Sequence, residues 1–81
     1  MKKSDLYETD RFKLSQSNDK MGWVLADKDN LIVIKWINKR FNDTQEVVTL
    51  DDFDPDKFQS LARIMREMGD WLVENHPNKL F

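Results

Sequence analysis

The sequence predicts a small α+β domain, a four-stranded antiparallel meander followed by one C-terminal amphipathic helix packed on one sheet face. Its 81 residues are enough for one domain. Four strand-like segments come first, separated by short runs of turn-forming residues, and a longer segment with helical spacing follows. The strands must be antiparallel neighbours, because a parallel pair needs a crossover of about a dozen residues.

The expected strands differ in how strongly their residues favour extended backbone. The first alternates polar and apolar side chains, which is typical of a half-buried strand. The third is the longest and is rich in Val, Ile and Trp, which favour strands. The four segments cover residues 11–15, 22–26, 31–41 and 45–50.

The helix has clear signals at both ends. Asp54 is a favoured N-cap residue, and Pro55 occupies the first helical position, where its missing N–H costs nothing. Phe53 and Phe58 have the spacing of a hydrophobic staple. A proline disfavours helix in the residue before it, so we expect the helix to end near Asn75.

One side of this helix is apolar and broad. Ile64 and Trp71 lie further round than the main apolar face, so the arc is wider than a helix on one sheet needs. Gly69 lies at the centre of the arc. In the middle of a helix, glycine lowers the stability by about 1 kcal/mol relative to alanine. We expect it to allow close approach of the helix backbone to the sheet. The main face consists of Phe58, Leu61, Ala62, Met65, Met68 and Leu72.

The sequence divides into one domain and two short ends. We expect a polar N-terminal arm at residues 1–10, a domain at residues 11–76 and a C-terminal tail at residues 77–81. A domain of this size buries about 60–65% of the surface of its unfolded chain, so its stability is marginal. The chain has no cysteine for a disulfide or a thiolate zinc site. Self-association is the remaining source of stability, and we expect a homodimer.

The charges are balanced overall but uneven along the chain. There are 13 Lys and Arg against 15 Asp and Glu, and a net charge of −2 does not favour general nucleic-acid binding. Residues 1–45 carry a net charge of +2 and residues 46–81 one of −4. No apolar run reaches the roughly 20 residues of a membrane span, and residues 1–5 lack the apolar core of a signal peptide. We therefore expect a cytoplasmic protein without membrane contact.

No residue pattern predicts an enzyme, a cofactor or a metal site. Asp52, Asp54 and Asp56 have the alternate spacing that opens a calcium loop, but Pro55 interrupts them and the required glycine and glutamate are missing. We interpret these aspartates as capping and favourable charge at a helix N-terminus. The single histidine, His76, has no second imidazole or thiolate to join, and we expect it to complement the helix dipole as a C-terminal cation.

The third expected strand carries apolar residues on both faces. Ile32, Ile34 and Trp36 form an uninterrupted apolar face, which we assign to the helix. The opposite face mixes basic and aromatic side chains, as in proteins where single-stranded bases stack on rings and cations follow the phosphates. The alternative is a solvated face whose lysines prevent aggregation. The candidate nucleic-acid-binding residues are Arg11, Lys13, Trp23, Lys35, Lys39, Arg40 and Phe41.

The flank of the helix also has two interpretations. Ile64, Met68 and Trp71 are the candidate interface residues, which would meet the same helix of a second copy or a protein partner. In the alternative interpretation, the N-terminal arm or the C-terminal tail folds back over them. The small size and the missing disulfides favour the dimer.

The order of strands and helix resembles that of a known family. Two stretches carry the resemblance: Trp23-Val24-Leu25 with Leu31-Ile32-Val33-Ile34-Lys35-Trp36, and Val47-Val48-Thr49-Leu50 running through Asp51–Lys57 to Phe58-Gln59-Ser60-Leu61. They resemble the paired strands, the last strand and the helix beginning of the single-stranded-DNA-binding transcriptional coactivator (positive cofactor) family and its Pur-alpha and Whirly relatives. The resemblance covers residues 11–75 and implies a ββββα fold, a dimer and nucleic-acid binding by the sheet.

Two non-catalytic functions follow from these patterns and remain open. The first is a homodimeric module that binds single-stranded nucleic acid through the basic and aromatic sheet face. The second is a protein-interaction adaptor or inhibitor, of a phage or mobile-element type, that uses the acidic second half of the chain and its apolar helix flank.

Overall fold

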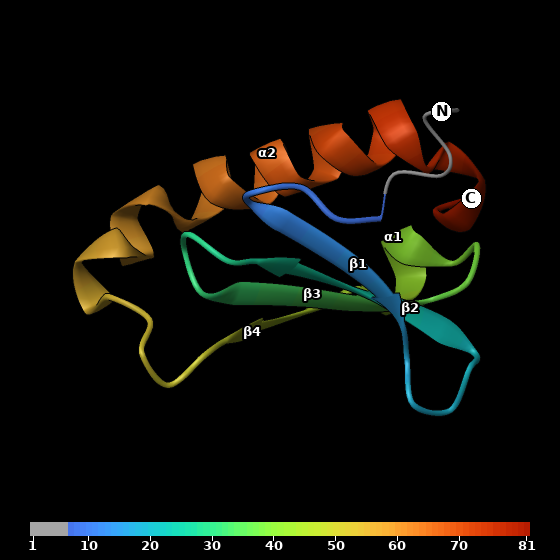
Figure 1. Ribbon diagram of the computed structural model, residues 1–81, viewed down its shortest axis with the longest axis horizontal. Helices are drawn as coiled ribbons and strands as arrows, with labels where there is room; N and C mark the ends of the chain where they lie inside the picture. Colours follow the sequence, from blue (N-terminus) through green and yellow to red (C-terminus); the bar gives the residue numbers. More distant parts are fainter. Residues whose placement is uncertain (1–6) are drawn as a thin grey trace.

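The computed structural model describes residues 7–81 and has the predicted fold class. Residues 1–6 of the expected N-terminal arm lie outside the described residues. Four strands form one antiparallel sheet in the order β1-β2-β3-β4, and helix α2 lies across one of its faces (Figure 1). The strands are β1 (Phe12–Gln16), β2 (Gly22–Asp27), β3 (Ile32–Ile37) and β4 (Glu46–Thr49). The helical segments are α1 (Phe41–Thr44), the 3₁₀ helices η2 (Pro55–Ser60) and η3 (Pro77–Lys79), and α2 (Leu61–Asn75).

The register of the sheet decides which side chains face α2. Leu14 pairs with Leu25, Leu25 with Ile34, and Ile34 with Val47, so these four side chains lie on one face. The predicted helix-covered face of β3 is confirmed, because its three apolar side chains are at most 4% exposed. The core also includes Phe12, Phe53, Ile64, Met68, Leu72 and Leu80.

The expected third strand is wrong in its second half. β3 ends at Ile37, and Lys39 has a positive φ of 66°, which turns the chain. The short helix α1 follows in place of extended backbone. The Phe41 N–H donates to the C=O of Leu80 at 3.0 Å, and the Phe41 ring packs edge-on against Trp36. A contact with the far end of the chain, which local sequence does not specify, therefore ends this strand.

The helical region begins with the predicted cap but in a tighter geometry. The Asp54 carboxylate accepts from the N–H of Asp56 at 3.0 Å. The rings of Phe53 and Phe58 have centroids 5.0 Å apart, as the hydrophobic staple predicts. These residues lead into the 3₁₀ helix η2, and α2 begins only after it. Helix α2 ends at Asn75, as predicted.

The apolar flank of α2 is not free for a partner. Ile64 is 1% and Met68 0% exposed, so both belong to the core of their own chain. The Trp71 ring packs against Phe12, with centroids 5.3 Å apart, and against His76, at 5.5 Å. Ile64 and Met68 are therefore not available for the predicted dimer or partner interface, and Trp71 is partly covered by its own chain. His76 lies at the C-cap of α2, as expected, and is 2% exposed.

Both described ends of the chain pack onto the domain. The Tyr7 ring lies 5.0 Å from that of His76, and the Tyr7 C=O accepts from the N–H of Leu14. At the other end, the Lys79 C=O accepts from Trp36 Nε1 at 2.8 Å. Residues 7–9 and 77–80 are thus structural parts of the domain.

Gly69 makes no close approach to the sheet, contrary to the expectation. A Cβ atom at this position would meet no heavy atom within 4 Å beyond its own stretch of helix. We expect Gly69→Ala to raise the free energy of unfolding by about 0.5–1 kcal/mol, because alanine favours helix and restricts the unfolded chain. Thermal unfolding followed by circular dichroism should show a midpoint roughly 2–8 °C higher. A lower midpoint would contradict this account of the position.

Gly22 is the glycine that the fold requires. It lies opposite Ile37 in the β2–β3 ladder, and a Cβ atom there would overlap the carbonyl oxygen of Trp36. We expect Gly22→Ala to lower the free energy of unfolding by about 1–3 kcal/mol, because the two strands must separate to admit the methyl group. Urea unfolding measures this loss. Gly69→Ala is the matched control, because the same substitution should change the stability in the opposite direction.

Candidate interaction surface

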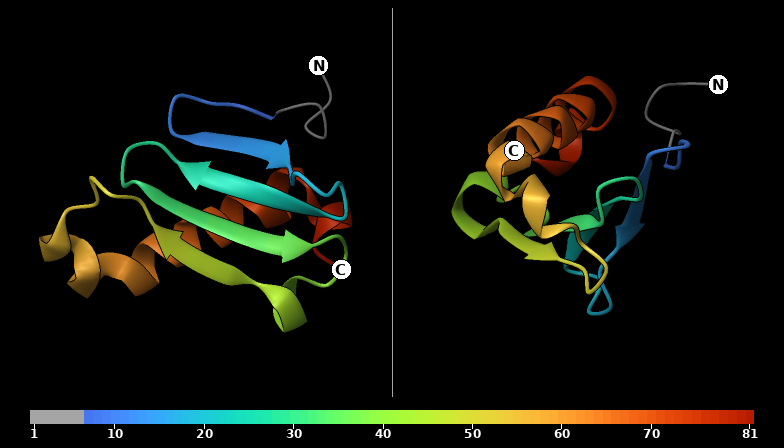
Figure 2. Two further views of the ribbon diagram at one scale, coloured as in Figure 1. Left: turned by 90° about the horizontal axis from the view of Figure 1, so that it is seen from below. Right: turned by 90° about the vertical axis from the view of Figure 1, so that its left-hand side faces the viewer.

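The sheet face opposite α2 is not covered by any described element (Figure 2, left). Residues on this face alternate with the core residues along each strand. The ladder places Ala26 beside Val33 and Val33 beside Val48, so one apolar row crosses three strands. We call this surface the outer band and define it as Val24, Ala26, Val33, Ile37 and Val48.

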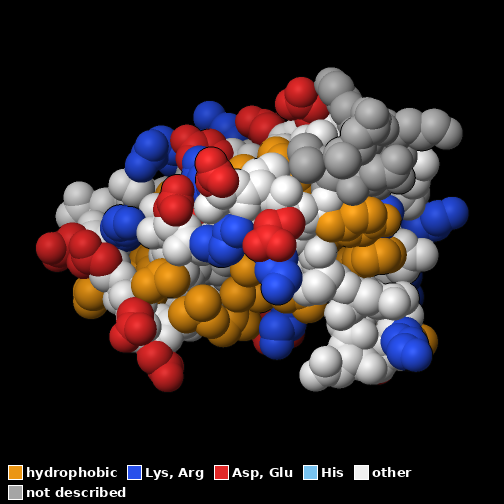
Figure 3. All heavy atoms as spheres, viewed as in Figure 1, with side chains coloured by type: hydrophobic (Ala, Val, Ile, Leu, Met, Phe, Trp, Pro, Cys, Tyr) orange, Lys and Arg blue, Asp and Glu red, His pale blue; other side chains and the backbone are white. Residues whose placement is uncertain are grey.

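The outer band is more apolar than a solvated sheet face requires. An antiparallel sheet with one wet face usually alternates apolar residues inside with polar residues outside. Here Val24, Ala26, Val33 and Val48 are half-buried, and Ile37 is 42% exposed. Figure 3 shows hydrophobic side chains gathered in the lower left of the view, with Lys or Arg side chains beside them. Removal of such a surface from water by a partner lowers the free energy and so favours binding.

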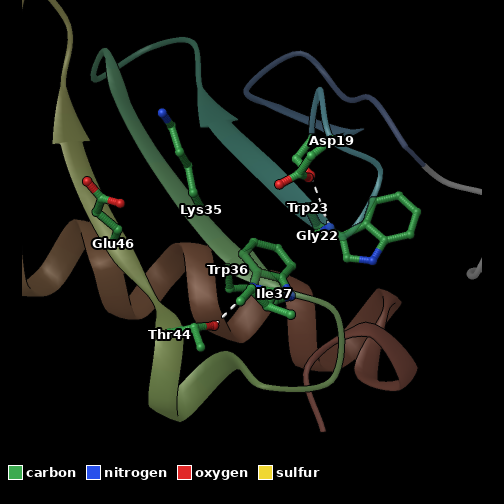
Figure 4. A pocket seen from close by; sticks show the side chains of 9 residues that line it. Asp19, Gly22, Trp23, Lys35, Trp36, Ile37, Thr44 and Glu46 are labelled. Atoms are coloured by element: carbon green, nitrogen blue, oxygen red, sulfur yellow. Dashed lines mark hydrogen bonds between the residues drawn. The ribbon is translucent and has the colours of Figure 1, made fainter.

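Two lysines and one glutamate accompany the outer band. Lys13 lies beside Ala26 in the ladder, and Lys35 lies between Val24 and Glu46. Figure 4 shows the Lys35 and Glu46 side chains projecting from neighbouring strands. All three charged side chains are exposed. No charged side chain therefore interrupts the apolar row where it crosses the three strands.

Two open hollows adjoin the band at the turn between β1 and β2. Their volumes are about 290 and 500 Å³, and both are lined by Ser17, Asp19 and Lys35. The Ser17 hydroxyl donates to the Asp19 carboxylate at 2.6 Å, and the N–H of Met21 donates to the same oxygen at 3.0 Å. These hydrogen bonds lower the pKa of Asp19 below its ordinary value. The Asp19 carboxylate therefore stabilises the turn between β1 and β2. The residues that line the hollows include no nucleophile paired with a general base.

Two of the predicted nucleic-acid-binding residues, Lys13 and Lys35, lie on the outer face. Arg11 does not point the same way as Lys13, and that expectation is wrong. Its guanidinium reaches across the other face, to Asp27 at 2.9 Å and to Glu67 of α2 at 2.8 Å. These hydrogen bonds raise the pKa of Arg11 against the opposing effect of burial. The buried Asp27 carboxylate, which sequence reasoning did not find, is the reason for this orientation.

The predicted stacking rings are also on the α2 side. Trp23 lies opposite Trp36 in the ladder, so the two side chains share the helix-covered face. Trp23 Nε1 donates to Asn38 Oδ1 at 3.0 Å, and Lys79 Nζ lies 4.8 Å from the centre of the Trp23 ring. Phe41 packs on the core beside Trp36. Neither predicted ring is therefore available on the outer face.

The last two predicted basic residues lie beyond the end of β3. Lys39 and Arg40 occupy the turn before α1, and the Lys39 N–H donates to the C=O of Lys79 at 3.0 Å. The Arg40 guanidinium is 3.9 Å from the Asp43 carboxylate. The structure therefore does not bring the seven predicted residues together on one surface.

The outer band is the feature that sequence reasoning missed. Its signal was present as alternation in the second and fourth expected strands, where Val24, Ala26 and Val48 stand at every second position. Joining these positions requires the register of both hairpins, which the sequence alone does not fix. Among residues 7–81, no group of three or more His, Cys, Asp or Glu side chains is placed to hold a metal ion. No helix in the same part of the chain combines the length and apolarity of a membrane span.

Comparisons with protein-family models, with curated proteins and with solved structures found no match to this chain. The resemblance to the single-stranded-DNA-binding coactivators therefore stays a prediction.

Proposed function

We propose that this chain is a non-catalytic protein-binding module, and that its outer band docks an apolar patch on a partner protein. The observation that carries this proposal is the apolar row of Ala26, Val33 and Val48 on the face that α2 leaves uncovered. A rigid three-strand platform loses little conformational entropy on binding, because its side chains are already ordered by the sheet. Burial of the row is then the main favourable contribution.

Charge complementarity defines the chemistry of the partner further. Lys13 and Lys35 border the row on the outer face, and both side chains are exposed. Cations at the rim of an apolar patch speed the approach of a surface of opposite charge and select against basic surfaces. The partner surface should therefore carry Asp or Glu around an apolar centre.

A protein partner is favoured over single-stranded nucleic acid because the outer band has no aromatic ring. Sequence-independent binding of single strands relies on base stacking together with a basic groove. The outer band offers only Val, Ala and Ile for such contacts. The two lysines beside the band also share the face with Glu46.

The test uses two pairs of matched variants. Val33→Asp places a charge in the apolar row, and Val73→Asp makes the same change at a site on α2 that is 55% exposed. Lys35→Glu reverses a charge beside the band, and Lys39→Glu makes the same change in the turn after β3. Each immobilised protein is incubated with a lysate, retained proteins are identified, and each is purified and titrated against the variants.

We expect a purified partner to bind the wild type, Val73→Asp and Lys39→Glu alike, and to bind Val33→Asp and Lys35→Glu at least tenfold more weakly. Circular dichroism establishes that each variant is folded. Retention of no protein, or equal binding by all five proteins, would overturn the proposal. Binding of a fluorescent single-stranded oligonucleotide at low salt, weakened by both Lys35→Glu and Lys39→Glu, would favour the nucleic-acid function instead.

A further inference from the structure

Strand β4 is an open edge with unused backbone hydrogen-bonding groups. The Leu50 N–H donates to the Leu31 C=O at 2.9 Å, which fixes the alternation along this ladder. Val48 and Glu46 therefore direct their N–H and C=O groups toward β3. Val47 and Thr49 direct theirs away from the sheet, where no described residue pairs with them. Figure 2 (left) shows no strand beyond β4.

The opposite edge of the sheet is partly closed by the chain itself. Along β1, the outward-directed groups belong to Phe12, Leu14 and Gln16. The Leu14 N–H donates to the Tyr7 C=O at 2.7 Å, and the Phe12 C=O accepts from the Thr9 N–H at 2.8 Å. The segment before β1 thus protects that edge, and β4 remains as the edge with a free run of donors and acceptors.

β4 also lacks the features that keep edge strands apart. It contains no proline and no lysine, and its ladder with β3 has no interruption. Its sequence, Glu46-Val47-Val48-Thr49, consists mainly of β-branched residues that favour a further strand beside them. Only its short length and Glu46 oppose such pairing.

We propose that the occupant of this edge is β4 of a second copy of the chain, paired antiparallel about a two-fold axis at Val48. This inference goes beyond the proposed function and does not depend on it. In this register Val47 lies opposite Thr49 of the partner subunit, and both residues have outward-directed groups. Four hydrogen bonds form, and all eight of the free groups on the two strands are used.

If the two β4 strands paired in a register shifted by one residue, fewer of their outward-directed N–H and C=O groups would find hydrogen-bond partners. An axis at Val47 requires the N–H of Gln45, which already donates to the C=O of Phe41. An axis at Thr49 requires Asp51, which lies in the turn after β4. The register at Val48 also keeps the two Glu46 side chains four residues apart along the ladder, about 13 Å, so their repulsion is weak. The self-pairing is therefore both geometrically and electrostatically consistent.

The proposed dimer has one continuous sheet made from both four-stranded sheets. Val48 would lie beside Val48 of the partner subunit on the outer face, so the two outer bands would join into one apolar surface. A symmetric contact of this kind closes on itself, because each β4 has a single free edge. It yields a dimer and not a filament.

The test is a pair of edge-proline variants. Val47→Pro removes an outward N–H that makes no hydrogen bond in the monomer, so the β3–β4 ladder stays intact. Gln16→Pro is the matched control, because it removes an outward N–H from β1 at a position without a backbone partner among residues 7–81. Size-exclusion chromatography with light scattering should give twice the 9.7 kDa chain mass for the wild type and Gln16→Pro, and the single-chain mass for Val47→Pro.

Amide hydrogen exchange on the wild type gives a second measurement that does not depend on the folding of a variant. In the dimer, the amides of Val47 and Thr49 should exchange at least tenfold more slowly than in dilute, dissociated protein. A wild type that keeps the single-chain mass at millimolar concentration overturns the proposal. So does a dimer that Val47→Pro leaves intact, or one in which these two amides exchange like unprotected ones.

Discussion

Asp27→Ala is expected to lower the free energy of unfolding by about 3 kcal/mol. The Asp27 side chain is fully buried at the end of β2. It accepts hydrogen bonds from Arg11 Nε at 3.0 Å, from the Asn30 side chain at 2.9 Å, and from the N–H groups of Asp29 and Asn30. Its removal leaves the donors in the β2–β3 turn unpaired and breaks the hydrogen bond that joins this turn to Arg11. The loss lies at the lower end of the range for buried ion pairs, because Arg11 remains partly exposed and can be hydrated.

Urea unfolding of Asp27→Ala and of a control, Asp29→Ala, measures this effect. Asp29 is exposed and lies two residues further along the same turn, so its replacement should change the stability by less than about 0.5 kcal/mol. The midpoint of thermal unfolding should fall by more than about 12 °C for Asp27→Ala. Equal stability of the two variants would show that the buried Asp27 carboxylate does not stabilise the β2–β3 turn and its contact with Arg11.

The same carboxylate should make the stability depend on pH. Burial alone raises the pKa of Asp27, but hydrogen bonds from Arg11 and Asn30 outweigh it and hold the pKa below its ordinary value. A group whose pKa is lower in the folded state stabilises that state above its unfolded pKa, about 4. This contribution is lost as the pH falls from about 5 through the folded pKa. Urea unfolding at several pH values measures this dependence. As the pH falls below about 5, the free energy of unfolding should decrease less for Asp27→Asn than for the wild type.

Leu80→Ala is expected to lower the free energy of unfolding by about 2–4 kcal/mol, a loss of similar size. Leu80 follows the 3₁₀ helix η3, is 1% exposed and belongs to the core cluster. Its backbone C=O also accepts from the Phe41 N–H, which positions α1. Truncation to alanine leaves a cavity between the end of the chain and the sheet, which the surrounding structure fills only in part.

Phe81→Ala is the natural control for this variant. Phe81 is the next residue, is also apolar, and is 64% exposed. Its replacement should change the free energy of urea unfolding by less than about 0.5 kcal/mol. If both variants lost a similar free energy of unfolding, the general hydrophobicity of the tail would stabilise the domain, and not the burial of Leu80 in the core.

The candidate surface could be predicted only in part from the sequence. Lys13 and Lys35 were placed on the uncovered face correctly, because period-two alternation within a strand fixes which side chains share a face. Arg11 was misplaced, since its orientation follows from an ion pair with a residue 16 positions away. Trp23 was misplaced because its face depends on the pairing of β2 with β3, and a shift of one residue moves every side chain to the other face.

The sequence by itself determined the four strands, the main helix and their order. The cap at Asp54, the alternation in the strands and the end of α2 at Asn75 are local signals, and short connections leave antiparallel pairing as the only choice. Tertiary structure alone decided where β3 ends, why the flank of α2 is buried and which strand edge stays open. The end of β3 and the burial of the flank depend on contacts between distant segments, Phe41 with Leu80 and Trp71 with Phe12. Such contacts are selected by packing of the whole chain, and no window of local sequence contains both partners.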